Sequence, residues 1–205
     1  MEDSNNEPSI FENLSENKEV LSDVQKQNKM SRTKSLILIS LFVSLLCISG
    51  LFLKVPMPPV PFSMTSFFAI TAGAILGKKK GVIACFAYMF MGTVCYLPVF
   101  TKGGGLWYVL EPTFGYILGY IIAAFIAGFI DKKTKTVKIG LIFTLAAFSV
   151  LVIGSIYAGI VLSITSPIPV WDIFFSYFVL FLPSDILKAV LATVVYKSLK
   201  NTGLF

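Results

Sequence analysis

The sequence contains no histidine, and only 14% of its 205 residues are charged. Histidine is the commonest general base and the commonest metal ligand, so its absence argues against many enzymes and metal proteins. Ordinary soluble domains carry about 25% charged residues. With 56% hydrophobic residues, a soluble fold would leave much apolar surface in water, whereas a bilayer accepts such surface. The composition therefore predicts one helical membrane domain.

Other signals of catalysis are also missing. The three cysteines, Cys47, Cys85 and Cys95, lie in apolar runs without metal-ligand spacing, and we interpret them as packing residues. The string GKKKG (77–81) lacks the spacing and the preceding strand of a phosphate loop, so we interpret it as a charged turn. We find no nucleophile–base pair or dinucleotide fingerprint in the sequence. We therefore expect a protein that is not an enzyme and binds no cofactor.

The chain begins with a polar, acidic segment and continues with six apolar runs. We expect residues 1–33 to form a disordered cytoplasmic tail, and residues 34–200 to form an all-α bundle of six transmembrane helices. Prolines 56, 58, 59 and 61 break the chain between the first two runs, and Pro183 interrupts the last. The runs are 35–53, 63–77, 81–97, 112–130, 139–164 and 171–198.

The basic residues alternate between the two ends of these runs. Clusters of lysine precede the first run and lie in every second connection, whereas the other connections hold only Lys54 and Lys102. Positive charge marks the cytoplasmic side of a membrane protein. The alternation therefore predicts six crossings with both termini in the cytoplasm, and we interpret the net charge of +6 as orienting charge rather than as a nucleic-acid surface. The clusters lie at 26–34, 78–80, 132–138 and 197–200.

Small residues recur four positions apart within the apolar runs. The pairs are Gly73/Gly77, Gly115/Gly119 and Ala124/Gly128, and this spacing lets helices approach closely. Ser40 and Ser44 have the same spacing in the first run. That face either packs inside the bundle or docks against another membrane subunit.

Charged residues inside a span are rare and usually functional, and the sixth run carries Asp185 and Lys188. Their i, i+3 spacing puts both on one helix face. The pair either neutralises itself or lines a ligand cavity beside Pro183, where backbone groups lose their partners. In the second case Lys188 would meet a carboxylate, and Asp185 would accept hydrogen bonds from ligand N–H groups.

Two further segments are candidates for ligand contact. In 97–116, LPVFTKGGGLWYVLEPTFGY, the glycines Gly103, Gly104 and Gly105 permit close backbone approach, and Trp107 can stack on a ring. That segment is interpreted as an outer lid, or alternatively as an interfacial aromatic anchor. The second segment is the stretch with prolines 56, 58, 59 and 61. It could line the ligand cavity with Phe62, or it could be a stiff connector between two helices.

Taken together, these strings resemble the BioY family, the biotin-specific substrate-binding (S) subunits of energy-coupling factor (ECF) transporters. The similarity covers about Ser35 to Lys200. It rests on an ordered series of motifs, namely PPVPFSMTSFFAITAGAILGKKKG, GTVCYLPVFTKGGG, EPTFGYILGYIIAAFIAG and LPSDILKAVLA.

The resemblance implies biotin held near the outer surface of a six-helix fold. It implies ligand contact by Asp185 and Lys188 in the last helix, by Thr113, Gly115 and Tyr116, and by the glycine loop. It also implies a transmembrane coupling subunit and a pair of cytoplasmic ATPases as partners, which would use the ATP. Glu111, Phe114 and Ser184 each replace a glycine that is usual in the family.

Two other functions stay open from the sequence alone. The chain could be an S subunit for a different vitamin, since pocket chemistry decides the ligand. It could also be a structural membrane protein that holds partners through its small-residue faces.

Overall fold

The computed structural model describes residues 32–55, 62–100, 103–131, 134–165 and 167–201. The chain divides into two compact units, Met1–Ile37 and Leu38–Phe205. In the first unit only 32–37 are described, and they are helical. Most of the predicted tail therefore lies outside the described residues, and the arrangement below is that of the second unit.

The described residues form six α-helices, one short 3-10 helix and a hairpin of two two-residue strands, and each predicted apolar run overlaps one α-helix. The helix Arg32–Leu51 comes first. Strands β1 (Lys54–Val55) and β2 (Phe62–Ser63) pair antiparallel, with Lys54 opposite Ser63. The remaining helices are α2 (Thr65–Leu76), α3 (Lys78–Thr93), η1 (Leu106–Leu110), α4 (Phe114–Ala127), α5 (Thr136–Thr165) and α6 (Val170–Asn201).

Helix lengths fall into two groups. Among the described residues, three helices are long and apolar enough to cross a membrane alone: Arg32–Leu51, α5 and α6. Helices α2 and α4 are apolar but contain only 12 and 14 residues. The fold is thus helical with at least three candidate spans, and the number of crossings depends on how the short helices lie in the bilayer.

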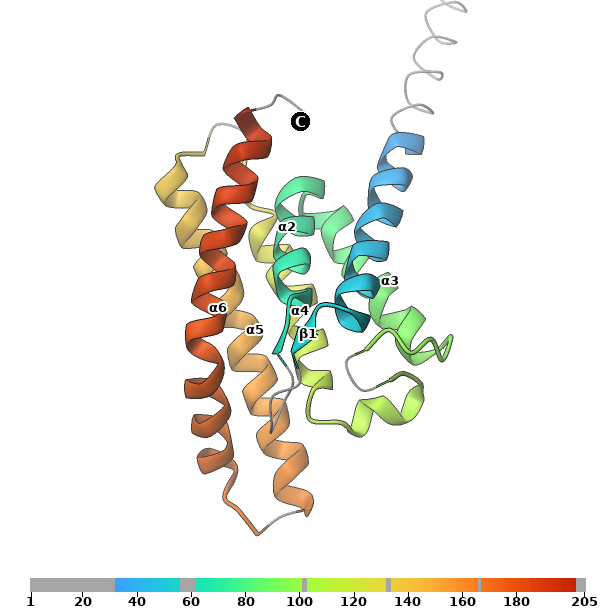
Figure 1. Cartoon of the computed structure of the whole chain (residues 1–205), viewed down its shortest axis with the longest axis vertical. Coiled ribbons are helices and arrows are strands. Elements are labelled where there is room, and N and C mark those ends of the chain that lie inside the picture. Colours follow the sequence, from blue (N-terminus) through green and yellow to red (C-terminus); the bar gives the residue numbers. More distant parts are fainter. Residues whose placement is uncertain (1–31, 56–61, 101–102, 132–133, 166, 202–205) are drawn as a thin grey trace, which may run out of the picture. The chain divides into compact units, whose positions relative to one another are not determined.

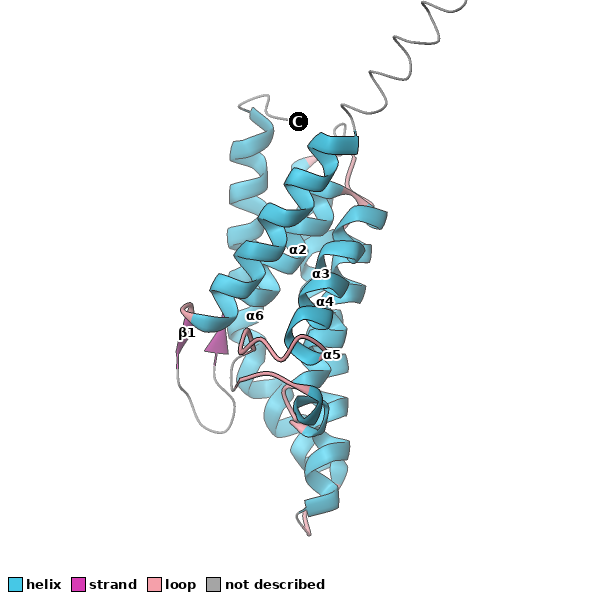
Figure 2. Ribbon diagram, turned by 90° about the vertical axis from the view of Figure 1, so that its right-hand side faces the viewer, coloured by secondary structure: helices cyan, strands magenta, loops and turns pink. Residues whose placement is uncertain are grey.

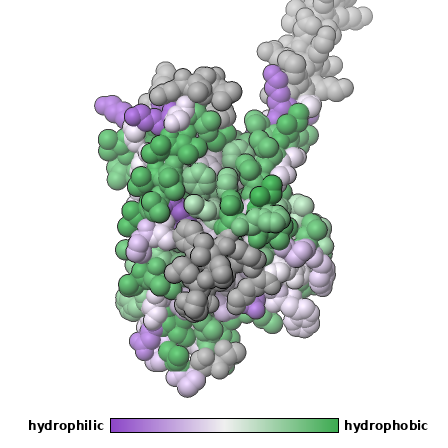
Figure 3. All heavy atoms as spheres, viewed as in Figure 1, coloured by the Kyte–Doolittle hydropathy of each residue, from purple (hydrophilic) through white to green (hydrophobic). Residues whose placement is uncertain are grey.

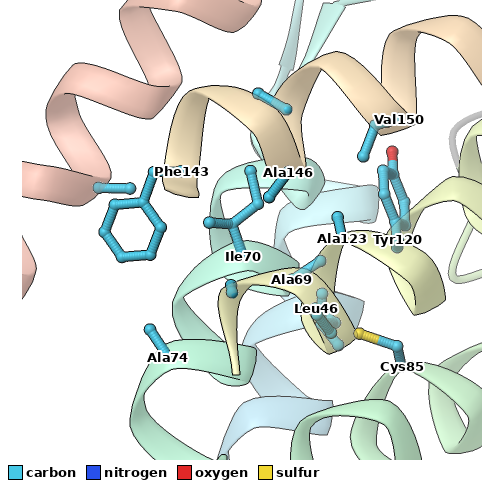
Figure 4. Close-up of a cluster of buried hydrophobic side chains, with 14 of the residues drawn as sticks. Leu46, Ala69, Ile70, Ala74, Cys85, Tyr120, Ala123, Phe143, Ala146 and Val150 are labelled. Atoms are coloured by element: carbon cyan, nitrogen blue, oxygen red, sulfur yellow. The ribbon is translucent and has the colours of Figure 1, made fainter. Parts of the chain in front are cut away.

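Helices α5 and α6 form a long antiparallel pair, and α4 packs against α5 (Figure 1). Helix α2 contacts α3, α4 and α6, and all the helices from α2 to α6 run roughly along one direction (Figure 2). Residues from several helices meet in one apolar core, among them Ile70, Ala123 and Phe143 (Figure 4). Hydrophobic residues also cover most of the visible helix faces (Figure 3), as lipid contact requires.

The small residues serve close helix packing at most of the predicted positions. A Cβ atom built on Gly73 would lie 2.1 Å from the Ala124 carbonyl oxygen, and one on Gly119 would lie 2.9 Å from the Val150 Cα atom. Gly77 is the exception, because an added Cβ there meets nothing within 4 Å. Its φ of 82° instead allows the chain to turn between α2 and α3.

Two expectations about local structure are wrong. The lysines at 78–80 do not form a turn, since they occupy the first turn of α3 and Gly77 alone makes the corner. Pro183 does not interrupt the last helix, because α6 continues through it. A proline inside a spanning helix is tolerated where neighbouring helices hold the segment in place, although its own N–H is missing from the ladder.

Candidate functional site

Asp185 and Lys188 are in direct contact on one face of α6. The Lys188 Nζ atom lies 3.0 Å from Asp185 Oδ1, and the residues are 5% and 6% exposed. Because both charges are buried, each needs the other, since an isolated charge in an apolar medium is costly. The pair therefore lies inside the bundle rather than against lipid.

Asp185 lies where α4, α5 and α6 meet. It interacts electrostatically with Tyr116 and Tyr120 of α4. On its α5 side it borders a hollow of about 30 Å³, lined also by Ala147 and Leu151. That volume suits about one water molecule. The ion pair thus has phenol groups on one side and mostly apolar side chains on the other.

Among the residues that the structure describes, several hydroxyls near this junction are buried without a hydrogen-bond partner. Most described serine and threonine side chains in α5 and α6 donate to their own helix, as Ser149 does to the Ala146 carbonyl (2.7 Å). Within the described residues, the hydroxyl oxygens of Tyr116, Ser155 and Ser184 are buried and make no hydrogen bond of normal geometry. The Tyr116 and Ser155 hydroxyls lie near each other, but outside hydrogen-bonding geometry. Buried hydroxyls that stay unpaired are costly, so a polar ligand that pairs them would gain affinity.

Ser155 was not among the residues predicted from the sequence. It is fully buried and follows Gly154, against which the Tyr116 ring packs. The sequence feature that could have identified Ser155 is a hydroxyl side chain inside the long apolar run 139–164. That signal is weak, because helical serines commonly bond to their own backbone.

Of the three predicted residues at the start of α4, Tyr116 is the one that interacts electrostatically with Asp185 in the described part of the chain. Thr113 is buried, and its Oγ1 atom lies 2.8 Å from the Tyr108 hydroxyl of η1. Gly115 gives room to Tyr157, whose Cβ atom would lie 2.2 Å from an added Cβ. The Tyr157 hydroxyl in turn donates to the Val109 carbonyl. Thr113 and Gly115 therefore fix η1 and α5 around the start of α4.

The glycine loop approaches its own chain closely. Gly103 and Phe100 exchange backbone hydrogen bonds of 2.9 and 3.2 Å, and the Gly105 N–H donates to the Gly92 carbonyl (2.7 Å). An added Cβ on Gly104 would lie 2.1 Å from the Leu97 carbonyl oxygen. In this conformation the glycines hold the loop against the end of α3, and their contact with a ligand stays a prediction.

The remaining predicted residues lie away from the ion pair or outside what is described. Trp107 is 77% exposed and borders an open hollow of about 380 Å³ that does not include Asp185. Phe62 belongs to β2, and its side chain is not among those described. Ser40 and Ser44 are exposed, and the Ser44 hydroxyl donates to the Ser40 carbonyl (2.9 Å).

Comparison with known proteins gives a consistent set of matches. The family model described as "BioY family" matches residues 22–203. The "Probable biotin transporter BioY" of Lysinibacillus sphaericus is 41% identical over 108 residues, which cover 53% of this chain and 54% of that protein. The "Biotin transporter BioY" of Rhizobium etli is 30% identical over 171 residues, covering 80% and 91%.

The match to other relatives is partial, and one solved structure has a similar fold. The aligned part covers 60% of the "Biotin transporter BioY" of Thermotoga maritima at 35% identity, and 50% of this chain. The crystal structure of the "S-component for biotin from an ECF-type ABC transporter" superposes with a TM-score of 0.67 at 28% identity. The superposed region covers 83% of this chain and 93% of the chain in that crystal structure.

Proposed function

This chain belongs to the BioY family, and from that premise we propose that it binds biotin and takes part in its uptake as the S subunit of an ATP-coupled ECF importer. Members of this family are transporter components rather than enzymes. With several apolar helices, the chain is a multi-pass membrane protein. The observation that carries the proposal is the buried Asp185–Lys188 pair, at the position where the similarity predicts ligand contact.

The ion pair suits a neutral polar group better than a free anion. Lys188 already neutralises Asp185 at 3.0 Å, so an added carboxylate would bring a net charge into a low-dielectric site. An ammonium has three donors and a carboxylate about four acceptor positions, so the pair offers both kinds of bond. The ureido ring of biotin carries N–H donors beside a carbonyl acceptor. Tyr116 and Ser155 add hydroxyls that can donate or accept.

The chain crosses the cytoplasmic membrane six times, with both termini in the cytoplasm. The distribution of lysines supports this topology. The Lys200 Nζ atom donates to the Thr134 carbonyl (3.1 Å), and the Lys78 Nζ atom lies 3.4 Å from the centre of the Phe129 ring. The basic residues at the start of α3, before α5 and at the end of α6 therefore share one end of the unit, and positive charge favours the cytoplasm.

The partners are a transmembrane coupling subunit and a pair of cytoplasmic ATPases, and this chain itself binds no cofactor. The coupling subunit docks on the face of the first helix that carries Ser40 and Ser44. Both serines are exposed, while Phe42 and Leu46 of the same helix are buried. Small side chains on an exposed face allow another helix to approach closely.

Replacing Ser40 and Ser44 by phenylalanine tests this docking surface. We expect uptake of biotin into cells to fall at least tenfold, with biotin affinity of the purified chain unchanged, because the bulky rings block only the partner. The Leu38→Phe variant, at an exposed position on another face of the same helix, serves as the control. Normal uptake by the serine variants would remove this face from the interface.

Equilibrium binding of labelled biotin to the purified full-length chain tests the function itself. We expect saturable binding with nanomolar affinity, as a high-affinity uptake system requires. Indifference to biotin with tight binding of another vitamin would identify an S subunit of different specificity. Failure to bind any vitamin would favour a structural membrane protein.

A further inference from the structure

The end of α3 and the 3-10 helix η1 expose a set of apolar and aromatic side chains. Phe90 near the end of α3 and Val94 just after it are exposed, and the Tyr96 ring lies beside Gly105, the residue before η1. Tyr96 then borders the same open hollow as Leu106, Trp107 and Leu110. We call these six residues the α3–η1 apolar surface. A water-facing lid of this composition would expose an unusually apolar patch.

Several backbone polar groups beneath this surface are paired within the chain. The Gly105 N–H donates to the Gly92 carbonyl, and the Tyr108 N–H donates to the Gly105 carbonyl (3.1 Å). Tyr108 is 4% exposed and points inward, with its hydroxyl 2.8 Å from Thr113 Oγ1. Polar groups thus lie inside and apolar side chains outside, which is the arrangement that lipid demands.

Helix length gives an independent reason to place this surface in the membrane. Helix α3 has 16 residues, or about 24 Å at 1.5 Å per residue. Its first turn holds Lys78, Lys79 and Lys80, which belong at the polar boundary. Helix α4 has 14 residues, or about 21 Å. The hydrocarbon core is about 30 Å thick, so neither helix reaches beyond it, and the segment joining them begins close to the membrane boundary rather than out in water.

We infer that the α3–η1 apolar surface is embedded in the interfacial region of the bilayer and contacts lipid, with Trp107 and Tyr96 near the headgroups. The surface continues the lipid-facing side of α3, where Phe86 is also exposed. Tryptophan and tyrosine prefer this depth because their rings are apolar and their edges polar. The η1 segment is therefore a membrane anchor that sets the position of the short helices. This placement does not depend on which vitamin the protein binds.

Fluorescence quenching of Trp107 tests the inference. The chain has two tryptophans, so Trp171→Phe leaves Trp107 as the sole emitter, and Trp171→Tyr is a second variant should the first misfold. The protein is placed in phosphatidylcholine vesicles whose lipids carry bromine either near the headgroup or deep in the acyl chain. We expect at least a twofold loss of emission with the shallow label, less with the deep label, and little quenching by aqueous iodide.

Three results would overturn the inference. Strong iodide quenching without lipid quenching would mean that Trp107 faces water. Strongest quenching by the deep label would place the segment in the hydrocarbon core. Blue-shifted emission that neither quencher affects would mean that a protein, such as a second copy of this chain, covers the surface. A Trp107→Phe variant, which leaves Trp171, provides the reference emission.

Discussion

The α4–α5–α6 junction and the α3–η1 segment place polar and apolar groups in opposite ways. At the junction, charged and hydroxyl groups are buried, and the oxygens of Tyr116 and Ser155 make no hydrogen bond within the described residues. In the α3–η1 segment, several backbone groups are paired internally and apolar side chains are exposed. The contrast indicates that the junction is arranged for a polar ligand, whereas the segment is arranged for a membrane. A mutation at the junction should therefore affect binding, whether or not it also affects stability, whereas a mutation in the α3–η1 segment should affect mainly stability.

The largest effect is expected from Asp185→Ala. Removing the carboxylate takes its opposite charge away from the buried Lys188 ammonium, which should lower the free energy of unfolding by about 3–5 kcal/mol and abolish biotin binding. Unfolding in detergent, followed by circular dichroism against urea, measures the stability. The exposed acid Asp172 of α6 supplies the control, Asp172→Ala. The double variant Asp185→Leu, Lys188→Met should recover stability without recovering binding. A fully stable Asp185→Ala protein would contradict the buried-pair account.

An intermediate effect, on stability, is expected from Gly104→Ala. The added methyl group would meet the Leu97 carbonyl oxygen at 2.1 Å, so the loop must shift, at a cost of about 1–3 kcal/mol. Gly140→Ala is the matched control, because its nearest contact would be an ordinary 3.8 Å. Urea unfolding of both variants measures the difference. Equal stabilities would mean that the loop is not held against α3.

The smallest effect is expected from Ser155→Ala. Losing one hydrogen bond to the ligand should weaken biotin affinity by about 0.5–1.5 kcal/mol, or about 2- to 12-fold. Stability should be unchanged or slightly higher, because the variant also removes a buried hydroxyl that has no partner in the described part of the protein. Ser149→Ala, whose hydroxyl bonds to its own helix, should leave biotin affinity unchanged in calorimetric titration. Equal affinities of the two variants would remove Ser155 from the site.

The sequence predicted the parts of this molecule that depend on local pattern. Apolar runs gave the six helices, and the i, i+3 spacing gave the contact between Asp185 and Lys188. The Pro183 interruption was wrong, because tertiary packing carries α6 past a missing hydrogen bond. The prediction that the lysines at 78–80 form a turn was wrong, because Gly77 with its positive φ is enough to reverse the chain between α2 and α3.

Other features depend on contacts between distant segments, which a single sequence does not reveal. Ser155 is unusual only because its hydroxyl finds no described partner, and that depends on how α4 packs against α5. The glycines at 103–105 were predicted to let a ligand come close to the backbone. In the structure, Gly103 and Gly105 instead form hydrogen bonds with the backbone of neighbouring residues in the same chain. Trp107 was interpreted as part of a lid or as an anchor, and only its exposure beside Tyr96 and Leu106 favours the anchor.

Biotin titration of wild-type protein against Lys188→Ala tests the central claim most directly, with Lys197→Ala, an exposed lysine of the same helix, as the control. Losing a donor to a buried polar group costs about 1–3 kcal/mol, so the Lys188 variant should bind about 5- to 150-fold more weakly, while the Lys197 variant binds normally. A folded Lys188→Ala protein with wild-type affinity for biotin would show that the buried pair does not contact the ligand.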